Sequence, residues 1–370
     1  MSNKHFDFII VGGGSAGCVL ANRLSANAAD KVCLLEAGPD DNTAFITIPG
    51  AFAYFMFSKK YNWMFNSETR DDIRKGQPVF CPQGKALGGG SAINAMIYIR
   101  GHRSDYDGWA ALGNKGWSFD ELLPYFRKNE NNERGGDHWH GDSGPLHVSD
   151  CRNYYAINER FLEAAGEAGF PATDDFNGEQ HEGTGFFQFT IKDGKRCSAS
   201  HAYLRPVRSR SNLNVECHAM ATRILFDGKR AIGVEYRRKG KTERIYADKE
   251  VIVSGGAYNS PHLLQVSGIG PAPHLQSIGV EVLHDLPGVG SNLADHFAAR
   301  IKHRVRGEVT MNQLSRFPRV LPEIARYVLF GTGALTFGVT SAMVFCRSRE
   351  GLASPDLQLS FTPATPVDMG

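Results

Sequence analysis

Residues 6–40, "FDFIIVGGGSAGCVLANRLSANAADKVCLLEAGPD", have the pattern of a strand, a glycine turn, a helix and a second strand. The mostly apolar run from Phe6 to Val11 is typical of a strand that is covered on both faces. Val32 to Leu35 repeats this pattern, and Gly38-Pro39 ends the second strand. The stretch therefore predicts a βαβ unit with two parallel strands.

The glycines of this turn have the GxGxxG spacing of a dinucleotide site. Gly12 permits the tight turn, Gly14 lets the backbone approach a pyrophosphate, and Gly17 lets the helix lie close to the strand. The helix N-terminus adds N–H groups that bind anions. Glu36 follows the second strand, where an acid accepts hydrogen bonds from ribose hydroxyls and disfavours the 2′-phosphate of NADP. The motif predicts a bound dinucleotide and leaves FAD and NAD as alternatives.

The composition is that of a soluble globular protein. The chain has 370 residues, of which 42% are hydrophobic and 22% charged, and this length favours about two domains. Lys and Arg number 41 against 39 Asp and Glu, which gives a formal net charge of +2. Without a basic field or a basic stripe with interleaved aromatic residues, nucleic acid is not expected as a partner.

Cysteine spacing and hydropathy bear on location. The seven cysteines are widely spaced without a CxxC pair, which favours reduced thiols over a zinc site or a disulfide framework. The N-terminus runs directly into the first strand without the apolar stretch of a secretory signal, so we expect a cytoplasmic protein. Residues 327–346 carry no charge, but glycines and hydroxyl residues interrupt them. We therefore expect a buried strand and loop there rather than a membrane span.

Later parts of the chain return to regular patterns. Helices are expected at residues 119–130 and 156–168. Residues 250–254 have the pattern of a strand, and a helix is expected to follow, with Ser260 as its N-cap and Gly268 at its end. Because this α/β pattern returns after a polar, turn-rich region, the nucleotide domain is predicted to be discontinuous.

A second glycine run lies in residues 84–101, "GKALGGGSAINAMIYIRG". Gly88 to Gly90 remove three side chains in a row, which suits a backbone pressed against a flat ring or a phosphate. A glycine-rich turn before a helix is the alternative. The aromatic residues 51–65 leave a similar choice between a loop that packs on a core and the wall of a ligand cleft.

The chain resembles the glucose-methanol-choline (GMC) family of FAD-dependent oxidoreductases. The resemblance runs from Phe6 to the last residue. It rests on "GGGSAGCVLANRLS" with "LLEAGP", "GKALGGGSAINAMIYIRG", "HGDSGPLHVSD", "SGGAYNSPHLLQVSGIGP" and "LPGVGSNLADH". Within the family, "CLLEAGP" and "INAMIYIRGH" are most similar to bacterial choline-dehydrogenase-like and aliphatic alcohol dehydrogenases.

The resemblance implies a mixed α/β and α+β fold, in which a Rossmann-like FAD-binding domain is interleaved with a sheet-based substrate domain. The FAD-binding domain is expected to be discontinuous, over residues 1–45, 75–105 and 200–300. The remaining segments, 46–74, 106–199 and 301–370, are expected to form an incomplete substrate domain.

The resemblance also implies cofactor-binding residues, position by position. Some family members attach the flavin covalently through a histidine at the position of Ile93, so non-covalent FAD is expected here. The implied contacts are Gly12, Gly14, Ser15 and Ala16 with the pyrophosphate, Glu36 with the adenosine ribose, Gly84, Gly89, Asn94, Ala95 and Met96 in the flavin-side segment, Ala221 with the adenine, and Ala257 near the cofactor.

The implied reaction is the oxidation of a primary alcohol to an aldehyde by hydride transfer to the flavin. A quinone-like acceptor is favoured over oxygen, together with peripheral association at the inner face of the membrane. In the family, a histidine base follows an HPxGTCxMG-like stretch, which this chain does not contain. The catalytic base therefore stays unassigned, and a truncated, non-catalytic FAD-binding remnant is the alternative function.

Histidines elsewhere do not supply an obvious substitute. His138 and His140 are spaced i, i+2 in a turn-rich segment, and without a third ligand this spacing binds metal poorly. His296 follows a glycine turn and is expected to be structural. No metal site is predicted.

Overall fold

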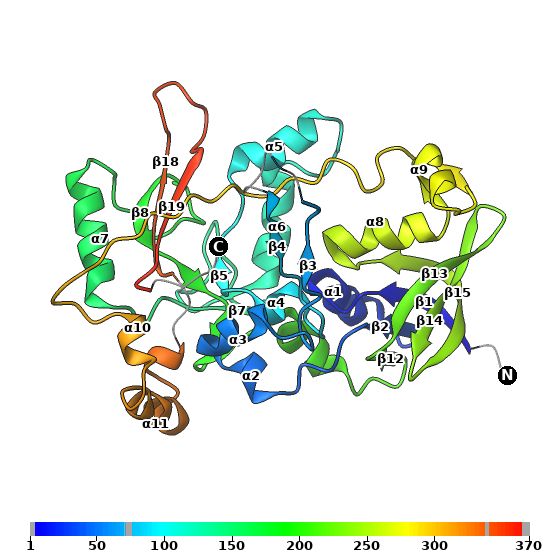
Figure 1. Cartoon of the computed structure of the whole chain (residues 1–370), viewed down its shortest axis with the longest axis horizontal. Helices are drawn as coiled ribbons and strands as arrows, with labels where there is room; N and C mark the ends of the chain where they lie inside the picture. Colours follow the sequence, from blue (N-terminus) through cyan, green and yellow to red (C-terminus); the bar gives the residue numbers. More distant parts are fainter. Residues whose placement is uncertain (1–3, 70, 72–75, 337–339, 365–370) are drawn as a thin grey trace. The chain divides into compact units, whose positions relative to one another are not determined.

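A computed structural model describes residues 4–69, 71, 76–336 and 340–364 (Figure 1). The chain divides into two compact units, and each contains three separate stretches of sequence. The first unit consists of Met1–Thr43, Ala53–Ile93 and Ser198–Ala299, and the second of Ala44–Phe52, Asn94–Cys197 and Arg300–Gly370.

The first unit is built on a six-stranded sheet with the order β12-β2-β1-β15-β14-β13. Strands β12, β2, β1 and β15 pair in parallel, and the two remaining pairs, β15 with β14 and β14 with β13, are antiparallel. The strands are β1 (Lys4–Val11), β2 (Val32–Leu35), β12 (Leu213–Glu216), β13 (Met220–Asp227), β14 (Arg230–Arg238) and β15 (Lys241–Val253). Helix α1 (Ser15–Leu24) connects β1 to β2, so the predicted βαβ unit is confirmed.

Apolar residues of β1 and β2 form the centre of this sheet. Ile9 and Ile10 are fully buried, as is all of β2, because neighbouring strands and helices cover both faces. Ile9 shares one core cluster with Tyr236 of β14 and Leu263 of helix α8 (Gly256–Val266). The smaller elements of this unit are α3 (Phe52–Met56, which starts in the second unit), β3 (Phe65–Asn66), β4 (Phe80–Cys81), α4 (Gly90–Ile93), η3 (Ser200–Leu204), η4 (Arg205–Val207), β16 (Ile269–Gly270), α9 (Ala272–Ser277) and β17 (His284–Asp285).

The start of α8 differs from the prediction. The helix begins at Gly256, so Ser260 lies inside it and is not the N-cap. Gly256 has φ +83, and this conformation, which is open to glycine, lets the chain turn from β15 directly into the helix. Gly268, with φ +91, lies just after the helix end, as predicted.

The second unit contains a three-stranded antiparallel sheet with the order β19-β18-β8. Helix α7 (Ala156–Glu167) packs on it through Ala165, which shares a core cluster with Val344 of β18, and through Phe161, which packs against this cluster. The helices expected at 119–130 and 156–168 are confirmed as α6 (Phe119–Asn129) and α7. The other elements are β8 (Gly183–Phe186), β18 (Ala342–Cys346), β19 (Leu357–Phe361), α2 (Ala44–Thr47), η1 (Pro49–Ala51), β5 (Ile97–Tyr98), α5 (Arg103–Ala111), β6 (Glu130–Asn132), β7 (Leu146–Val148), β9 (Gln188–Phe189), β10 (Ile191–Lys192), β11 (Lys195–Arg196), α10 (Met311–Leu314), α11 (Val320–Phe330) and η5 (Ala334–Thr336).

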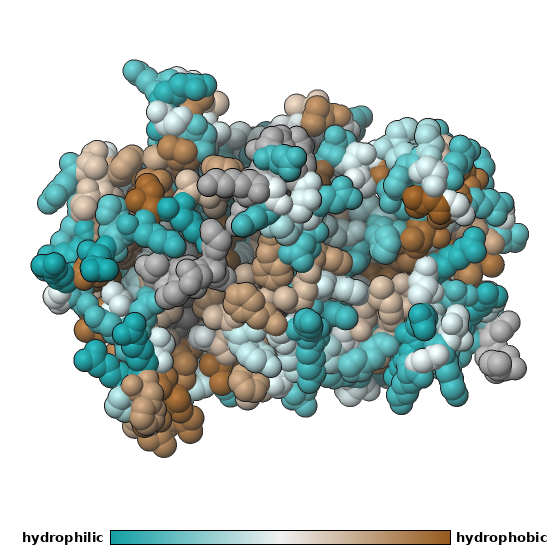
Figure 2. Space-filling view, in the orientation of Figure 1, coloured by the Kyte–Doolittle hydropathy of each residue, from teal (hydrophilic) through white to brown (hydrophobic). Residues whose placement is uncertain are grey.

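The uncharged segment 327–346 is only partly the buried strand and loop that was expected. Residues 342–346 form the buried strand β18, whereas 327–330 end helix α11, where Val328 and Phe330 are more than 70% exposed. These side chains contribute to an apolar surface over α11 (Figure 2). Residues 337–339 lie outside the described part. Within it, every helix is too short or too polar to cross a bilayer.

The aromatic segment 51–65 contains helix α3 as well as loop. Phe55 and Tyr61 are buried, which supports a packing role, while Tyr54 and Phe57 are more than half exposed. Backbone hydrogen bonds from Lys85 N to Tyr61 O (2.8 Å) and from Trp63 N to Gln83 O (2.9 Å) tie the segment to residues 83–85. From Ala53 onward it therefore belongs to the first unit. The sequence had predicted that residues 46–74 belong to the substrate domain. Of these, residues 70 and 72–74 lie outside the described part of the chain.

Candidate functional site

The first glycine run turns tightly between β1 and α1 because no side chain fits there. Gly12 has φ +103, and a Cβ on it would lie 2.5 Å from Ser254 O. A Cβ on Gly17 would lie 1.9 Å from Gly12 O, so the helix can approach the turn only without a side chain. Ser254 adds a hydrogen bond from its Oγ to Gly12 O (2.9 Å). The turn is therefore fixed by the close approach of α1 at Gly17 and by the hydrogen bond from Ser254.

The N-terminus of α1 is suited to an anion. Gly14 is its N-cap, no side chain caps it, and its first turn contains no acidic residue. Ser15 and Ala16 are exposed. The first N–H groups of a helix have no intrahelical partner, and the helix dipole adds a partial positive charge at this end. A phosphate group would be stabilised at this position.

Glu36 braces the same turn from the end of β2. Its Oε2 accepts a hydrogen bond from Gly13 N (2.9 Å) and its Oε1 accepts one from Gly38 N (2.7 Å). Burial raises the pKa of this carboxyl, and the two backbone N–H groups act against that rise. The sequence pointed to a ribose contact for Glu36 and missed this brace.

The second glycine run lies directly against the first. Gly88 N donates a hydrogen bond to Gly13 O (2.8 Å), and a Cβ on Gly89 would lie 2.7 Å from the Cα of Gly14. Gly84 also packs closely against this run, because a Cβ added to Gly84 would lie 2.2 Å from Gly89 O. Helix α4 begins at Gly90, the last glycine of the run, so the run includes the turn before a helix that was one of the two expected alternatives.

The remaining predicted residues of the first unit lie on neighbouring elements. Ala257 is exposed in the first turn of α8. Two residues earlier, Gly255 lies close to the first glycine run, because a Cβ added to Gly12 would be 2.9 Å from the Cα of Gly255. Ala221 lies in β13 and packs against the core cluster of the sheet. Ala219 N, which precedes that strand, donates a hydrogen bond to Glu36 O (2.8 Å). The first unit thus brings Gly12, Gly14, Ser15, Ala16, Glu36, Gly84 and Gly89 together, with Ala221 and Ala257 on adjoining elements.

Asn94, Ala95 and Met96 belong to the second unit. Asn94 is exposed, Ala95 is half-buried and Met96 is fully buried. Arg196 contacts Asn94 with its guanidinium, and the sequence reasoning missed this residue. The only available signal was an arginine among small and apolar residues in "RCSASHAYL".

His140 is a structural residue. Its Nδ1 lies 2.9 Å from Glu130 Oε1 and its Nε2 lies 2.9 Å from Asp175 Oδ2. Burial lowers its pKa, but the hydrogen bonds to Asp175 and Glu130 outweigh this and raise the pKa to about 9. A protonated imidazole cannot ligate a metal. Among the described residues, no three His, Cys, Asp or Glu side chains gather as a metal cluster.

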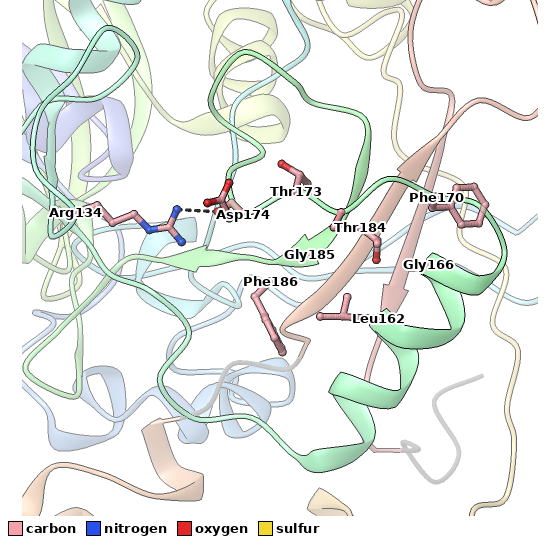
Figure 3. Close-up of a pocket in the computed structure, with 10 residues that line it drawn as sticks. Arg134, Leu162, Gly166, Phe170, Thr173, Asp174, Thr184, Gly185 and Phe186 are labelled. Atoms are coloured by element: carbon pink, nitrogen blue, oxygen red, sulfur yellow. Dashed lines mark hydrogen bonds between the residues drawn. The ribbon is translucent and has the colours of Figure 1, made fainter.

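A cavity of about 320 Å³ lies between α7 and β8 of the second unit (Figure 3). Leu162 and Phe186 line it, and the guanidinium of Arg134 donates to Asp174 O (2.7 Å) beside it. None of the predicted site residues lines this cavity. The glycine runs of the first unit are therefore the better candidate site.

Comparisons with known proteins agree with this choice. The family described as GMC oxidoreductase matches residues 6–298. Human mitochondrial choline dehydrogenase is 41% identical over 376 residues, which cover 100% of this chain and 63% of that protein. Oxygen-dependent choline dehydrogenase of Photobacterium profundum is 43% identical over 367 residues, with 98% and 64% covered. The chain thus spans less than two thirds of the length of these relatives.

Solved structures have the same fold. Pyridoxine 4-oxidase from Mesorbium loti superposes with a TM-score of 0.83 at 29% identity, covering 97% of this chain and 67% of that one. An FAD-dependent oxidoreductase from Chaetomium thermophilum has a TM-score of 0.82 at 32% identity, covering 92% and 62%. The α/β fold predicted from the sequence is confirmed by these similarities and by the parallel sheet.

Replacing Gly89 by Ala should separate the two glycine runs. The new Cβ would collide with Gly14 Cα, and the positive φ of +52 disfavours alanine. We expect the free energy of unfolding to fall by about 2–4 kcal/mol, measured by chemical denaturation. Gly90→Ala is the matched control, because its Cβ would meet nothing within 4 Å. Equal stability of the two variants would contradict the proposed contact.

The His140 contacts predict a loss of stability at high pH. Because the folded pKa lies above the usual value of 6.5, the contribution is complete below about pH 6.5 and is lost as pH rises through about 9. The melting temperature of the wild type should therefore fall more steeply between about pH 7 and pH 10 than that of His140→Gln. Parallel slopes for the two proteins would show that the contacts do not raise this pKa.

Proposed function

Because this chain belongs to the GMC oxidoreductase family, we propose that it binds FAD and oxidises a primary alcohol of the choline type to an aldehyde. The observation that carries the proposal is the direct contact between the two glycine runs, one of which lies at the N-terminus of α1. We also propose that the first unit is the FAD-binding domain and the second unit the substrate domain.

The residues of the first unit fit FAD. The uncapped N-terminus of α1, with exposed Ser15 and Ala16, would hold the pyrophosphate. Each carboxylate oxygen of Glu36 accepts one backbone N–H, and each retains a lone pair for a ribose hydroxyl. An acidic residue at the end of β2 agrees with a dinucleotide that lacks a 2′-phosphate.

The chemistry divides between cofactor and protein. FAD, when bound, supplies the acceptor for the hydride of the alcohol carbon. The residues of this chain hold and orient it, and Ile93 offers a hydrocarbon side chain with no atom that could bond covalently to a flavin. We therefore propose non-covalent binding. We assign no catalytic base.

For the electron acceptor, we propose a quinone-like compound at the inner face of the membrane. The name of the Photobacterium relative makes oxygen the competing acceptor. The alternative of a non-catalytic remnant is not favoured, because similarity to choline dehydrogenases at 41–43% identity runs along essentially the entire chain.

The cofactor and substrate class can be tested on the purified chain. We expect flavin absorption bands after incubation with FAD, and faster dye reduction with choline than with a simple alkanol of similar size. Assays with a soluble quinone and with oxygen compare the two acceptors. A chain that takes up no FAD contradicts the proposed function, while flavin uptake with equal rates for both alcohols contradicts the proposed substrate class.

The mode of attachment has its own measurement. Acid precipitation of the FAD-loaded protein should release all flavin into the supernatant, because Ile93 cannot form the bond that a histidine forms. Installing that histidine, as Ile93→His, provides the comparison. Yellow, fluorescent precipitate from the wild type would disprove non-covalent binding.

A further inference from the structure

Arg196 is a buried cation in β11 of the second unit. Its side chain is 1% exposed, and its Nε donates to Ile46 O (3.0 Å). The Nη1 group donates to both Asn94 O (2.7 Å) and Asn94 Oδ1 (2.8 Å). Burial lowers its pKa to about 10, so the guanidinium is still protonated at neutral pH. The guanidinium of Arg196 therefore binds both the backbone carbonyl and the side-chain carbonyl of Asn94.

These contacts decide which way the carboxamide of Asn94 faces. Its Oδ1 accepts from Arg196 and also from Met96 N (3.1 Å), as in an Asx turn. The reverse orientation would place an NH₂ group against two donors, which is unfavourable. The amide Nδ2 takes no part in these contacts, and Asn94 is exposed at the surface of its unit. Asn94 therefore presents its Nδ2 amide group as a hydrogen-bond donor at the surface of the unit.

The backbone that follows Asn94 is firmly held in the second unit. Met96 is fully buried in a core cluster with Phe189 and Met343, although its backbone has the strained φ of +63. Its carbonyl oxygen accepts a hydrogen bond from Thr190 N (2.8 Å). The backbone on both sides of Ala95 is therefore held, at Asn94 by Arg196 and at Met96 by Thr190.

We propose that Arg196 is a positioning residue that fixes Asn94 as a hydrogen-bond donor to an acceptor atom of the flavin ring. This inference rests on the proposed function, because it takes FAD as the ligand of this segment. A flavin ring carries carbonyl oxygens and ring nitrogens that accept hydrogen bonds. A donor that is already oriented loses little side-chain entropy on binding, so it favours affinity more than a mobile one.

Asn94→Asp separates the donor from its anchor. The aspartate keeps an oxygen for Arg196 and for Met96 N, and it adds a charge pair with the guanidinium. It replaces the outward NH₂ by an acceptor. We expect the melting temperature to stay equal or rise, while the Kd for FAD, measured by fluorescence titration of the full chain, increases at least about tenfold. The absorption spectrum of the bound flavin should shift, because one ring atom loses its donor.

Arg196→Lys tests the positioning role. Lysine keeps the charge but lacks the planar fork, so we expect a higher Kd for FAD and a shifted flavin spectrum. Arg100→Lys is the matched control, because Arg100 is also buried in the second unit but pairs with Glu130 (2.7 Å). It should lower stability and leave the Kd for FAD within about twofold.

The outcomes separate the two proposals. Wild-type protein that binds no FAD overturns the proposed function, and this inference with it. Wild type that binds FAD, with unchanged Kd and spectrum in Asn94→Asp, overturns the inference alone. Loss of affinity in Arg196→Lys that is no greater than in Arg100→Lys would reduce Arg196 to a purely structural residue and overturn its positioning role.

Discussion

The contact between two backbone segments without side chains is the constraint on which the candidate site depends. Gly88 N reaches Gly13 O, and Gly89 lies so close to Gly14 that a single methyl group would force them apart. The two glycine runs are far apart in the sequence, yet their backbones are in direct contact. Their contact explains why one chain needs both, and it places the second run next to the helix N-terminus where an anion is stabilised.

Other parts of the first unit maintain this contact. Glu36 binds the N–H of Gly13, and Ser254 binds the carbonyl of Gly12, so the turn is held on two sides by side chains from β2 and the end of β15. Glu36 directly follows the buried strand β2, and Ser254 directly follows β15, which pairs with β1. Stability of the sheet and competence of the site are therefore linked, because the same turn belongs to both.

Local patterns predicted more of the fold than of the site. The βαβ unit and helices α6 and α7 follow from apolar periodicity and turn residues in short windows, and the structure contains them. For the second glycine run, the sequence left a contact with a flat ring or a phosphate and a turn before a helix as alternatives. Its contact with Gly13 and Gly14 could not be identified, because those residues lie far from it in the sequence. Ser260 was wrongly taken as an N-cap, since Gly256 gives the chain an earlier way into the helix. Arg196 was missed because its partners Ile46 and Asn94 lie far from it in the sequence.

Hydrogen exchange with and without FAD shows whether the two glycine runs hold the cofactor together. We expect FAD to slow amide exchange in peptides covering Gly12–Ala16 and in peptides covering Gly84–Gly90, with both effects saturating at the same FAD concentration. Protection of only one of the two runs, or protection of neither in a protein that binds FAD, would contradict it.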